Sequence, residues 1–216
     1  MVNCTPSRRQ AAKESVEPRK SAASSPGPAE ENGRPVIVAL GDSLTAGLGV
    51  DVQDNYPSKL QKKLLEGRYR YRVINAGVSG DTTAQGLNRL GSVRELRPEV
   101  VIVALGANDG LRGIPLESTG RNLDTIVADL QGDGAKVILA GMLIPPNYGP
   151  EYTRTFRELF PDLAKKHRVP LIPFLLEGVA GNMNLNQADG IHPTAQGYDI
   201  VAESVWKVLR PLLRKG

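Results

Sequence analysis

EVVIVALG, residues 99–106, is a run of β-branched and aliphatic residues that ends on a glycine. Two further runs share this character, PVIVALG at 35–41 and KVILAGM at 136–142. Apolar runs of this length, without alternation of polar residues, are typical of strands buried on both faces of a parallel sheet. YRVINAG at 71–77 and VPLIPF at 169–174 add two more candidates. Five strands are therefore predicted.

Amphipathic segments separate these runs. Their apolar residues recur at three- and four-residue spacings, the period of one helix face. Four such stripes stand in the sequence: Tyr56, Leu60 and Leu64; Leu123, Ile126, Val127 and Leu130; Tyr152, Phe156, Leu159, Phe160 and Leu163; and Tyr198, Val201, Val205, Val208 and Leu212. Alternation of strands with helices predicts a parallel sheet with right-handed crossovers and helices on both faces. Ligands of such sheets bind beyond the carboxyl ends of the strands.

The chain divides by composition into a tail and one domain. Residues 1–34 are rich in Ser, Pro, Ala and charged residues, which predicts a disordered tail, and residues 35–216 form the expected domain. The formal net charge is +4 without a long basic run, so no nucleic-acid partner is expected. No stretch approaches the roughly 20 apolar residues of a membrane span.

The single cysteine, Cys4, excludes an internal disulfide and a cysteine-based metal cluster. An incidental cysteine in a tail is the simpler interpretation. The alternative is a lipid-attachment site whose signal is missing, with the Ser- and Pro-rich stretch as a tether. The compartment therefore stays open between a periplasmic or lipid-anchored location and the cytoplasm.

GDSLTAG follows the first predicted strand, at residues 41–47. Gly41 permits a tight turn there, and Ser43 then stands at the start of the next helix. Taken alone, Ser43 is interpreted as a helix N-cap, since Ser and Asp favour that position. The spacing excludes a P-loop and a dinucleotide-binding fingerprint, and the glycine-x-serine-x-glycine elbow is absent as well.

Gly-rich turns also follow the second and third predicted strands, NAGVSGDTT at 75–83 and LGANDG at 105–110. Gly80 offers a bare backbone N–H, and Asn108 offers a side-chain amide. Taken singly, each of them is typical of a turn.

The segment DGIHP, residues 189–193, lies after the fifth predicted strand and so at the same sheet edge. Asp189 is close enough to accept a hydrogen bond from one nitrogen of His192, which leaves the other nitrogen facing Ser43. The only other histidine, His167, is expected at a solvated helix end, so no zinc site is predicted. A nucleophile, a base and an orienting acid remain, with two candidate oxyanion donors.

Together these four blocks resemble the SGNH hydrolases, also called GDSL esterases or lipases. The resemblance covers about residues 36–213, and the segments NDGLRG and PPNYG are similar to the bacterial subgroup of combined thioesterases, lysophospholipases and arylesterases. It implies a flavodoxin-like three-layer α/β/α sandwich with a five-stranded parallel sheet, and ester hydrolysis without a cofactor.

The resemblance also implies roles for individual residues. Ser43 would be the nucleophile, His192 the base and Asp189 its partner, with an oxyanion hole formed by the Ser43 and Gly80 N–H groups and the Asn108 side chain. The expected activity is hydrolysis of short- to medium-chain aryl and alkyl esters, with thioesters and lysophospholipids as further substrates. The alternatives are an acyltransferase or carbohydrate deacetylase using the same site, which acyl transfer to an alcohol or sugar would reveal, and a non-catalytic binding domain.

The expected partner is a small-molecule ester or lipid-like substrate in an open groove, with no separate lid helix. The loops at 108–115 and 144–152 carry apolar side chains suited to contact several acyl carbons. These candidates are Leu111, Ile114, Ile144 and Tyr148. Anchoring of the loops to the core is the alternative role for each of them.

Overall fold

The computed structural model of the chain describes Met1 and residues 33–215. The predicted tail, residues 1–34, lies almost wholly outside the described residues. Cys4 is one of the residues outside them. From Gly33 onward the chain forms one compact unit.

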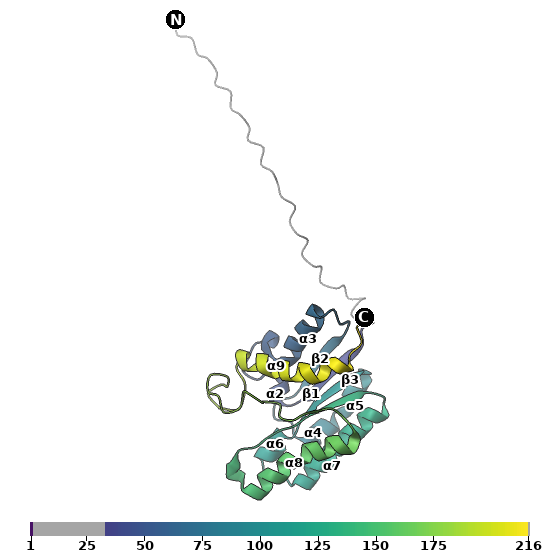
Figure 1. The fold of residues 1–216 in the computed structure, drawn as a ribbon, viewed down its shortest axis with the longest axis vertical. Helices are drawn as coiled ribbons and strands as arrows, with labels where there is room; N and C mark the ends of the chain where they lie inside the picture. Colours follow the sequence, from purple (N-terminus) through teal and green to yellow (C-terminus); the bar gives the residue numbers. More distant parts are fainter. Residues whose placement is uncertain (2–32, 216) are drawn as a thin grey trace. The chain divides into compact units, whose positions relative to one another are not determined.

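A five-stranded parallel sheet forms the centre of this unit (Figure 1). Its strands are β1 (Val36–Gly41), β2 (Arg72–Gly77), β3 (Val100–Ala104), β4 (Lys136–Ala140) and β5 (Leu171–Ile172). Their order across the sheet is β2-β1-β3-β4-β5, and every neighbouring pair is parallel. The predicted α/β fold with five parallel strands is confirmed.

Helices cover both faces of the sheet. The elements are α2 (Ser43–Ala46), η1 (Val52–Asp54), α3 (Tyr56–Glu66), α4 (Thr83–Asn88), α5 (Leu90–Glu95), α6 (Ala107–Leu111), α7 (Leu116–Gly132), η2 (Pro146–Tyr148), α8 (Pro150–His167), α9 (Ala195–Leu209) and η3 (Arg210–Leu212). Helices α3 and α9 pack together on one face, and α4, α7 and α8 lie on the other (Figure 1).

Burial explains why the central strands read as continuous apolar runs. All residues of β1 and β3 are buried, whereas β2 at one edge of the sheet is mostly half-buried. Strand β5 at the other edge has only two residues, fewer than the six predicted. Pro170 stands directly before it and has no N–H to donate to β4, although its carbonyl accepts from the Leu139 N–H at 3.0 Å.

The strand order places a switch point between β1 and β3, because the chain leaves β1 for β2 on one side and enters β3 on the other. Such points form a crevice at the carboxyl ends of the strands. Gly41 ends β1 there without a left-handed backbone, so the expected tight turn is wrong as the reason for this glycine. A Cβ at Gly41 would overlap Thr45 and lie 2.8 Å from the Ala104 carbonyl oxygen. The glycine is needed for this close approach of α2 and β3.

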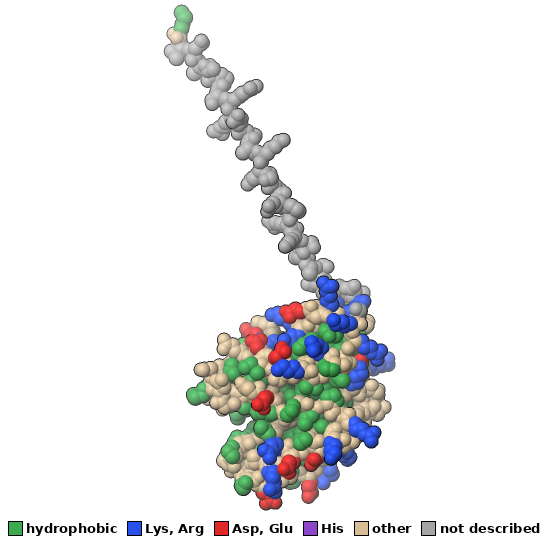
Figure 2. Space-filling view, in the orientation of Figure 1, with side chains coloured by type: hydrophobic (Ala, Val, Ile, Leu, Met, Phe, Trp, Pro, Cys, Tyr) green, Lys and Arg blue, Asp and Glu red, His purple; other side chains and the backbone are tan. Residues whose placement is uncertain are grey.

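On the face drawn in Figure 2, basic and acidic side chains are interspersed around apolar side chains that gather near its middle. Within the described part of the chain, every helix is too short or too polar to cross a membrane.

Candidate active site

Ser43 is the first residue of α2 and follows the end of β1 by two positions. The N-cap of α2 is Asp42, whose Oδ1 accepts a hydrogen bond from the Leu44 N–H at 3.0 Å. The interpretation of Ser43 as the cap is therefore wrong by one residue. Because Asp42 caps the helix, the Ser43 hydroxyl is left to interact with a group from another loop.

That group is His192, in the segment between β5 and α9. Two contacts close this segment into a loop at its base: Asn186 and Pro193 form an antiparallel bridge, and the Gln187 N–H donates to the His192 carbonyl at 2.7 Å. Helix α9 begins at Ala195, after the N-cap Thr194, so Pro193 stands just before the helix and not in its first turn. The loop therefore fixes the backbone of His192 just before the start of α9.

Ser43, His192 and Asp189 form a continuous hydrogen-bonded chain. His192 Nε2 lies 2.8 Å from Ser43 Oγ, and His192 Nδ1 lies 2.7 Å from Asp189 Oδ2. A neutral imidazole that donates from Nδ1 to the carboxylate has its Nε2 lone pair directed at the serine hydroxyl. This tautomer makes Nε2 the atom that is able to accept the Ser43 proton.

Asp189 is held as an anion by hydrogen bonds, and its side chain is 45 % exposed. Its Oδ1 accepts from the His192 and Ile191 backbone N–H groups at 3.0 and 2.9 Å. These two bonds, followed by the bond from the His192 side chain, lower the pKa of Asp189 to about 2. The carboxylate is thus charged at neutral pH.

Gly80 occupies the turn after β2, with a left-handed φ of 85° that favours glycine. The Asp81 N–H donates to the Val78 carbonyl at 3.1 Å and closes this turn. Among the described residues, the backbone N–H groups of Ser43 and Gly80 donate to no other protein group. Both donors are therefore available to a bound molecule.

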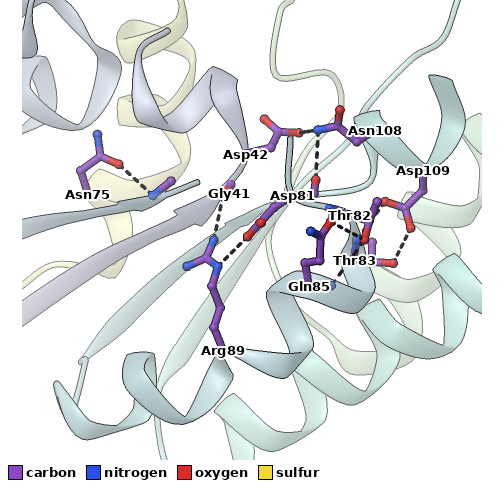
Figure 3. Close-up of polar contacts among 11 residues, drawn as sticks. Gly41, Asp42, Asn75, Asp81, Thr82, Thr83, Gln85, Arg89, Asn108 and Asp109 are labelled. Atoms are coloured by element: carbon purple, nitrogen blue, oxygen red, sulfur yellow. Dashed lines mark hydrogen bonds and ion pairs between the residues drawn. The ribbon is translucent and has the colours of Figure 1, made fainter. Parts of the chain in front are cut away.

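Asn108 lies in the first turn of α6, directly after β3. Its Nδ2 lies 3.0 Å from the Asp81 carbonyl oxygen and 3.3 Å from Asp42 Oδ2, between the turns that follow β1 and β2 (Figure 3). The first contact has ordinary hydrogen-bond length, and the second is longer and weaker. One amide hydrogen is thus firmly held by Asp81, whereas the other is loosely bound.

Asp42 is 1 % exposed, and it is the buried acid nearest to Ser43 in sequence. Burial is the largest influence on this carboxyl and raises its pKa to about 6. The hydrogen bond from the Leu44 N–H and the field of His192 oppose the shift, and the charge of Asp81 adds to it. A buried carboxyl of this kind makes the stability of the protein depend on pH.

We expect the wild-type chain to lose stability relative to the Asp42→Asn variant as the pH rises from about 4 to about 7. The native pKa of about 6 lies above the ordinary value of 3.8, so in this window the unfolded state has released a proton that the native state still binds. The two-unit gap corresponds to about 3 kcal/mol of stability. Urea unfolding of both proteins at several pH values measures this difference. A difference that stays constant over the window would contradict the assignment.

The four predicted substrate-contacting residues lie around the loops at 108–115 and 144–152. Leu111, Ile114 and Tyr148 are half-buried, whereas Ile144 is only 6 % exposed and packs where a Cβ on Gly110 would stand. The Tyr148 hydroxyl donates to the Leu111 carbonyl at 2.7 Å, which joins the two loops. Contact of these residues with a substrate stays a prediction, and Ile144 has little surface to offer.

His167, the other histidine, ends α8, but its side chain is only 11 % exposed. Its Nε2 lies 2.6 Å from Asp124 Oδ1 on the neighbouring helix α7. The expectation of a solvated helix end is therefore wrong about exposure, because α7 and α8 pack together at this point. Within the described residues, no group of three His, Cys, Asp or Glu side chains is placed to hold a metal ion.

Several site-supporting residues were not predicted from the sequence. Asp81 follows Gly80, and its buried carboxylate pairs with Arg89. The Gln187 side chain donates to the Leu48 carbonyl at 2.7 Å and joins the histidine loop to the chain beyond α2. Asp81 stands inside the conspicuous SGDTT turn, whereas no local pattern marks Arg89 or Gln187.

A parallel α/β sheet that brings a serine, a histidine and a carboxylate into one hydrogen-bonded chain defines a hydrolase of the serine type. A sequence model of the GDSL-like Lipase/Acylhydrolase family matches residues 39–200. The chain belongs to this family, as the four sequence blocks predicted, and it is an ester hydrolase.

Individual relatives support this membership. The chain is 43 % identical over 178 residues to Esterase TesA of Pseudomonas aeruginosa, covering 82 % of this chain and 89 % of that protein. It is 38 % identical to Thioesterase 1/protease 1/lysophospholipase L1 of Escherichia coli, covering 82 % and 84 %. A crystal structure of TesA superposes with a TM-score of 0.80 at 42 % identity, covering 82 % of this chain and 99 % of that one.

Proposed function

We propose that this hydrolase cleaves short- to medium-chain carboxylic esters through an acyl-enzyme on Ser43, with His192 and Asp189 completing a catalytic triad. The observation that carries the proposal is the placement of His192 between the other two, at 2.8 Å from Ser43 Oγ and 2.7 Å from Asp189 Oδ2. No cofactor is needed, since the nucleophile, the base and the oxyanion donors all come from the chain.

In the first half-reaction, Ser43 Oγ attacks the ester carbonyl carbon while its proton passes to His192 Nε2. The tetrahedral intermediate then collapses, the bond to the leaving alcohol breaks, and His192 returns the proton to that oxygen. In the second half-reaction, His192 takes a proton from water, the hydroxide attacks the acyl carbon, and the carboxylic acid leaves as Ser43 is reprotonated. Asp189 stabilises the imidazolium formed in both halves.

Three donors would stabilise the oxyanion: the N–H groups of Ser43 and Gly80, and the Asn108 amide. The two backbone N–H groups have no other acceptor among the described residues. Asn108 would keep one hydrogen on the Asp81 carbonyl and transfer the other from the 3.3 Å contact with Asp42 to the oxyanion. The donors come from the ends of three adjacent strands, so their positions are fixed before the substrate binds.

The surroundings of the triad favour modest acyl chains. Three large apolar side chains in the loops beside the site are exposed: Leu48, Val78 and Ile191, at 47 %, 45 % and 44 %. These side chains offer an apolar rim beside the triad and do not enclose the triad. Relatives named Arylesterase, from Vibrio mimicus at 39 % identity, and Thioesterase 1/protease 1/lysophospholipase L1 motivate aryl esters, thioesters and lysophospholipids as test substrates.

We expect kcat/KM to be highest for p-nitrophenyl esters of short to medium acyl chains and to stop rising before palmitate. Each methylene contributes only the buried part of about 0.8 kcal/mol, and an open rim buries little of the distal carbons. The measurement is kcat/KM from acetate to palmitate below each aggregation limit, with acyl-CoA and lysophospholipid tested in parallel. A steady rise to palmitate would argue for a deep acyl tunnel. Absence of hydrolysis across the whole panel would contradict the proposed function.

A further inference from the structure

A largely buried ion pair lies directly behind the proposed oxyanion hole. Arg89 Nε donates to Asp81 Oδ2 at 2.6 Å, and the side chains are 24 % and 6 % exposed (Figure 3). Asp81 is the residue that follows Gly80, so its carboxylate is attached to the turn that presents the Gly80 N–H. Exposed ion pairs contribute little to structure, whereas a buried one requires its partner, since an unpaired buried carboxylate is costly.

The same arginine reaches a second strand end. Arg89 Nη2 donates at 2.9 Å to the carbonyl of Gly41, the last residue of β1, two positions before Ser43. The planar guanidinium has several donors in a fixed geometry, which allows one side chain to fix the distance between two acceptors. Arg89 therefore joins the turn that carries Ser43 to the turn that carries Gly80.

Asp81 extends this connection to the third donor. Its backbone carbonyl accepts the 3.0 Å bond from Asn108 Nδ2, so one residue is bonded to Arg89 through its side chain and to Asn108 through its backbone. All three groups of the proposed oxyanion hole are thus linked to the Asp81–Arg89 pair.

Helix α4 holds the two ends of this pair at a fixed separation. It starts after the N-cap Thr82, next to Asp81, and ends at its C-cap Arg89. Thr82 and Gln85 form a capping box, in which the Gln85 side chain accepts from the Thr82 N–H at 2.9 Å. The start of the helix is further anchored by the Thr83 N–H, which donates to Asp109 at 2.8 Å. A short capped helix thus directs the Arg89 side chain back to the turn from which the helix starts.

We propose that Arg89 is a positioning residue of the oxyanion hole: by bonding both the Asp81 carboxylate and the Gly41 carbonyl, it keeps the Ser43, Gly80 and Asn108 donors convergent. This inference rests on the proposed function, because it assigns Arg89 to the oxyanion hole of that reaction. Arg89 touches none of the reacting atoms and acts through the backbone that it holds.

The test is the Arg89→Met variant, which keeps an unbranched side chain and removes every donor. We expect kcat to fall by about 10- to 100-fold, the cost of a displacement near 1 Å in a catalytic constellation. KM should stay within about twofold, since an oxyanion hole acts mainly in the transition state. The acid limb of the pH–rate profile should not move, because the His192–Asp189 contact is untouched.

Arg94→Met is the matched control, since Arg94 makes a two-bond pair with Asp133 at an exposed site. It should leave kcat unchanged. If Arg89→Met unfolds below the assay temperature, Asp81→Asn removes the charge pair while keeping the Asp81 carbonyl, and a smaller loss of kcat is expected because the amide oxygen can still accept from Arg89. A kcat within twofold of wild type in a folded variant would overturn the inference, and so would full recovery by Arg89→Lys, which keeps the charge but not the planar fork.

Failure of this inference is distinguishable from failure of the proposed function. If Ser43→Ala abolishes hydrolysis while Arg89→Met keeps full kcat, only the role of Arg89 is wrong. If Ser43→Ala remains active, the nucleophile itself is misassigned, whatever Arg89→Met does.

Discussion

Ser43→Ala is expected to lower kcat/KM for a p-nitrophenyl ester by about 10⁴- to 10⁶-fold, the range found when a triad nucleophile is removed. The variant loses the atom proposed to form the acyl-enzyme, whereas the proposed oxyanion donors remain. The measurement is the steady-state rate of ester hydrolysis by the folded variant, compared with the rate of the uncatalysed reaction.

The fold should tolerate this change. Ser43 is not the N-cap of α2, and the cap bond between Asp42 and Leu44 does not involve its hydroxyl. The thermal midpoint of Ser43→Ala should therefore stay close to that of wild type. Ser92→Ala, an exposed serine in α5, is the matched control and should keep full activity. Activity of Ser43→Ala within tenfold of wild type would show that another group attacks the ester.

Asn108→Ala is expected to lower kcat by about 10²- to 10³-fold, the usual cost of one lost oxyanion donor. Two effects combine in this variant. The oxyanion no longer receives the amide hydrogen that lies near Asp42, and the Asp81 carbonyl loses its 3.0 Å bond. The measured quantities are kcat and KM for one activated and one unactivated ester.

KM should change little, because the negative charge on the substrate oxygen that the amide would stabilise develops only in the transition state. Asn184→Ala, at an exposed position after β5, is the control and should leave both constants unchanged. A variant in which KM rises while kcat stays the same would make Asn108 a substrate-binding residue and not an oxyanion donor.

The sequence predicted the fold well because burial of the central strands leaves a continuous apolar signal. EVVIVALG became β3, with all five strand residues buried, and the glycine-rich turns after β1, β2 and β3 meet at one edge because the strands are parallel. The convergence of Ser43 and His192, 149 positions apart, follows from the same topology. Sheet direction thus turns four separate motifs into one site.

The remaining features depend on contacts that no local pattern encodes. Arg89 lies 48 positions from Gly41, and its role follows only from where α4 points it. Asp42 and Ser43 are both good N-caps, so the local sequence does not determine which of them caps α2. The contact of Ser43 with His192 decides it. The need for glycine at position 41 arises from the approach of Thr45 and Ala104, which depends on packing and not on turn conformation.

Covalent labelling with a fluorophosphonate, followed by peptide mapping, identifies the residue that attacks the substrate. We expect one phosphonyl group per protein, located on the peptide containing Ser43, with complete loss of activity and no labelling of Ser43→Ala. An adduct on a different residue, or stoichiometric labelling of Ser43→Ala, would contradict it.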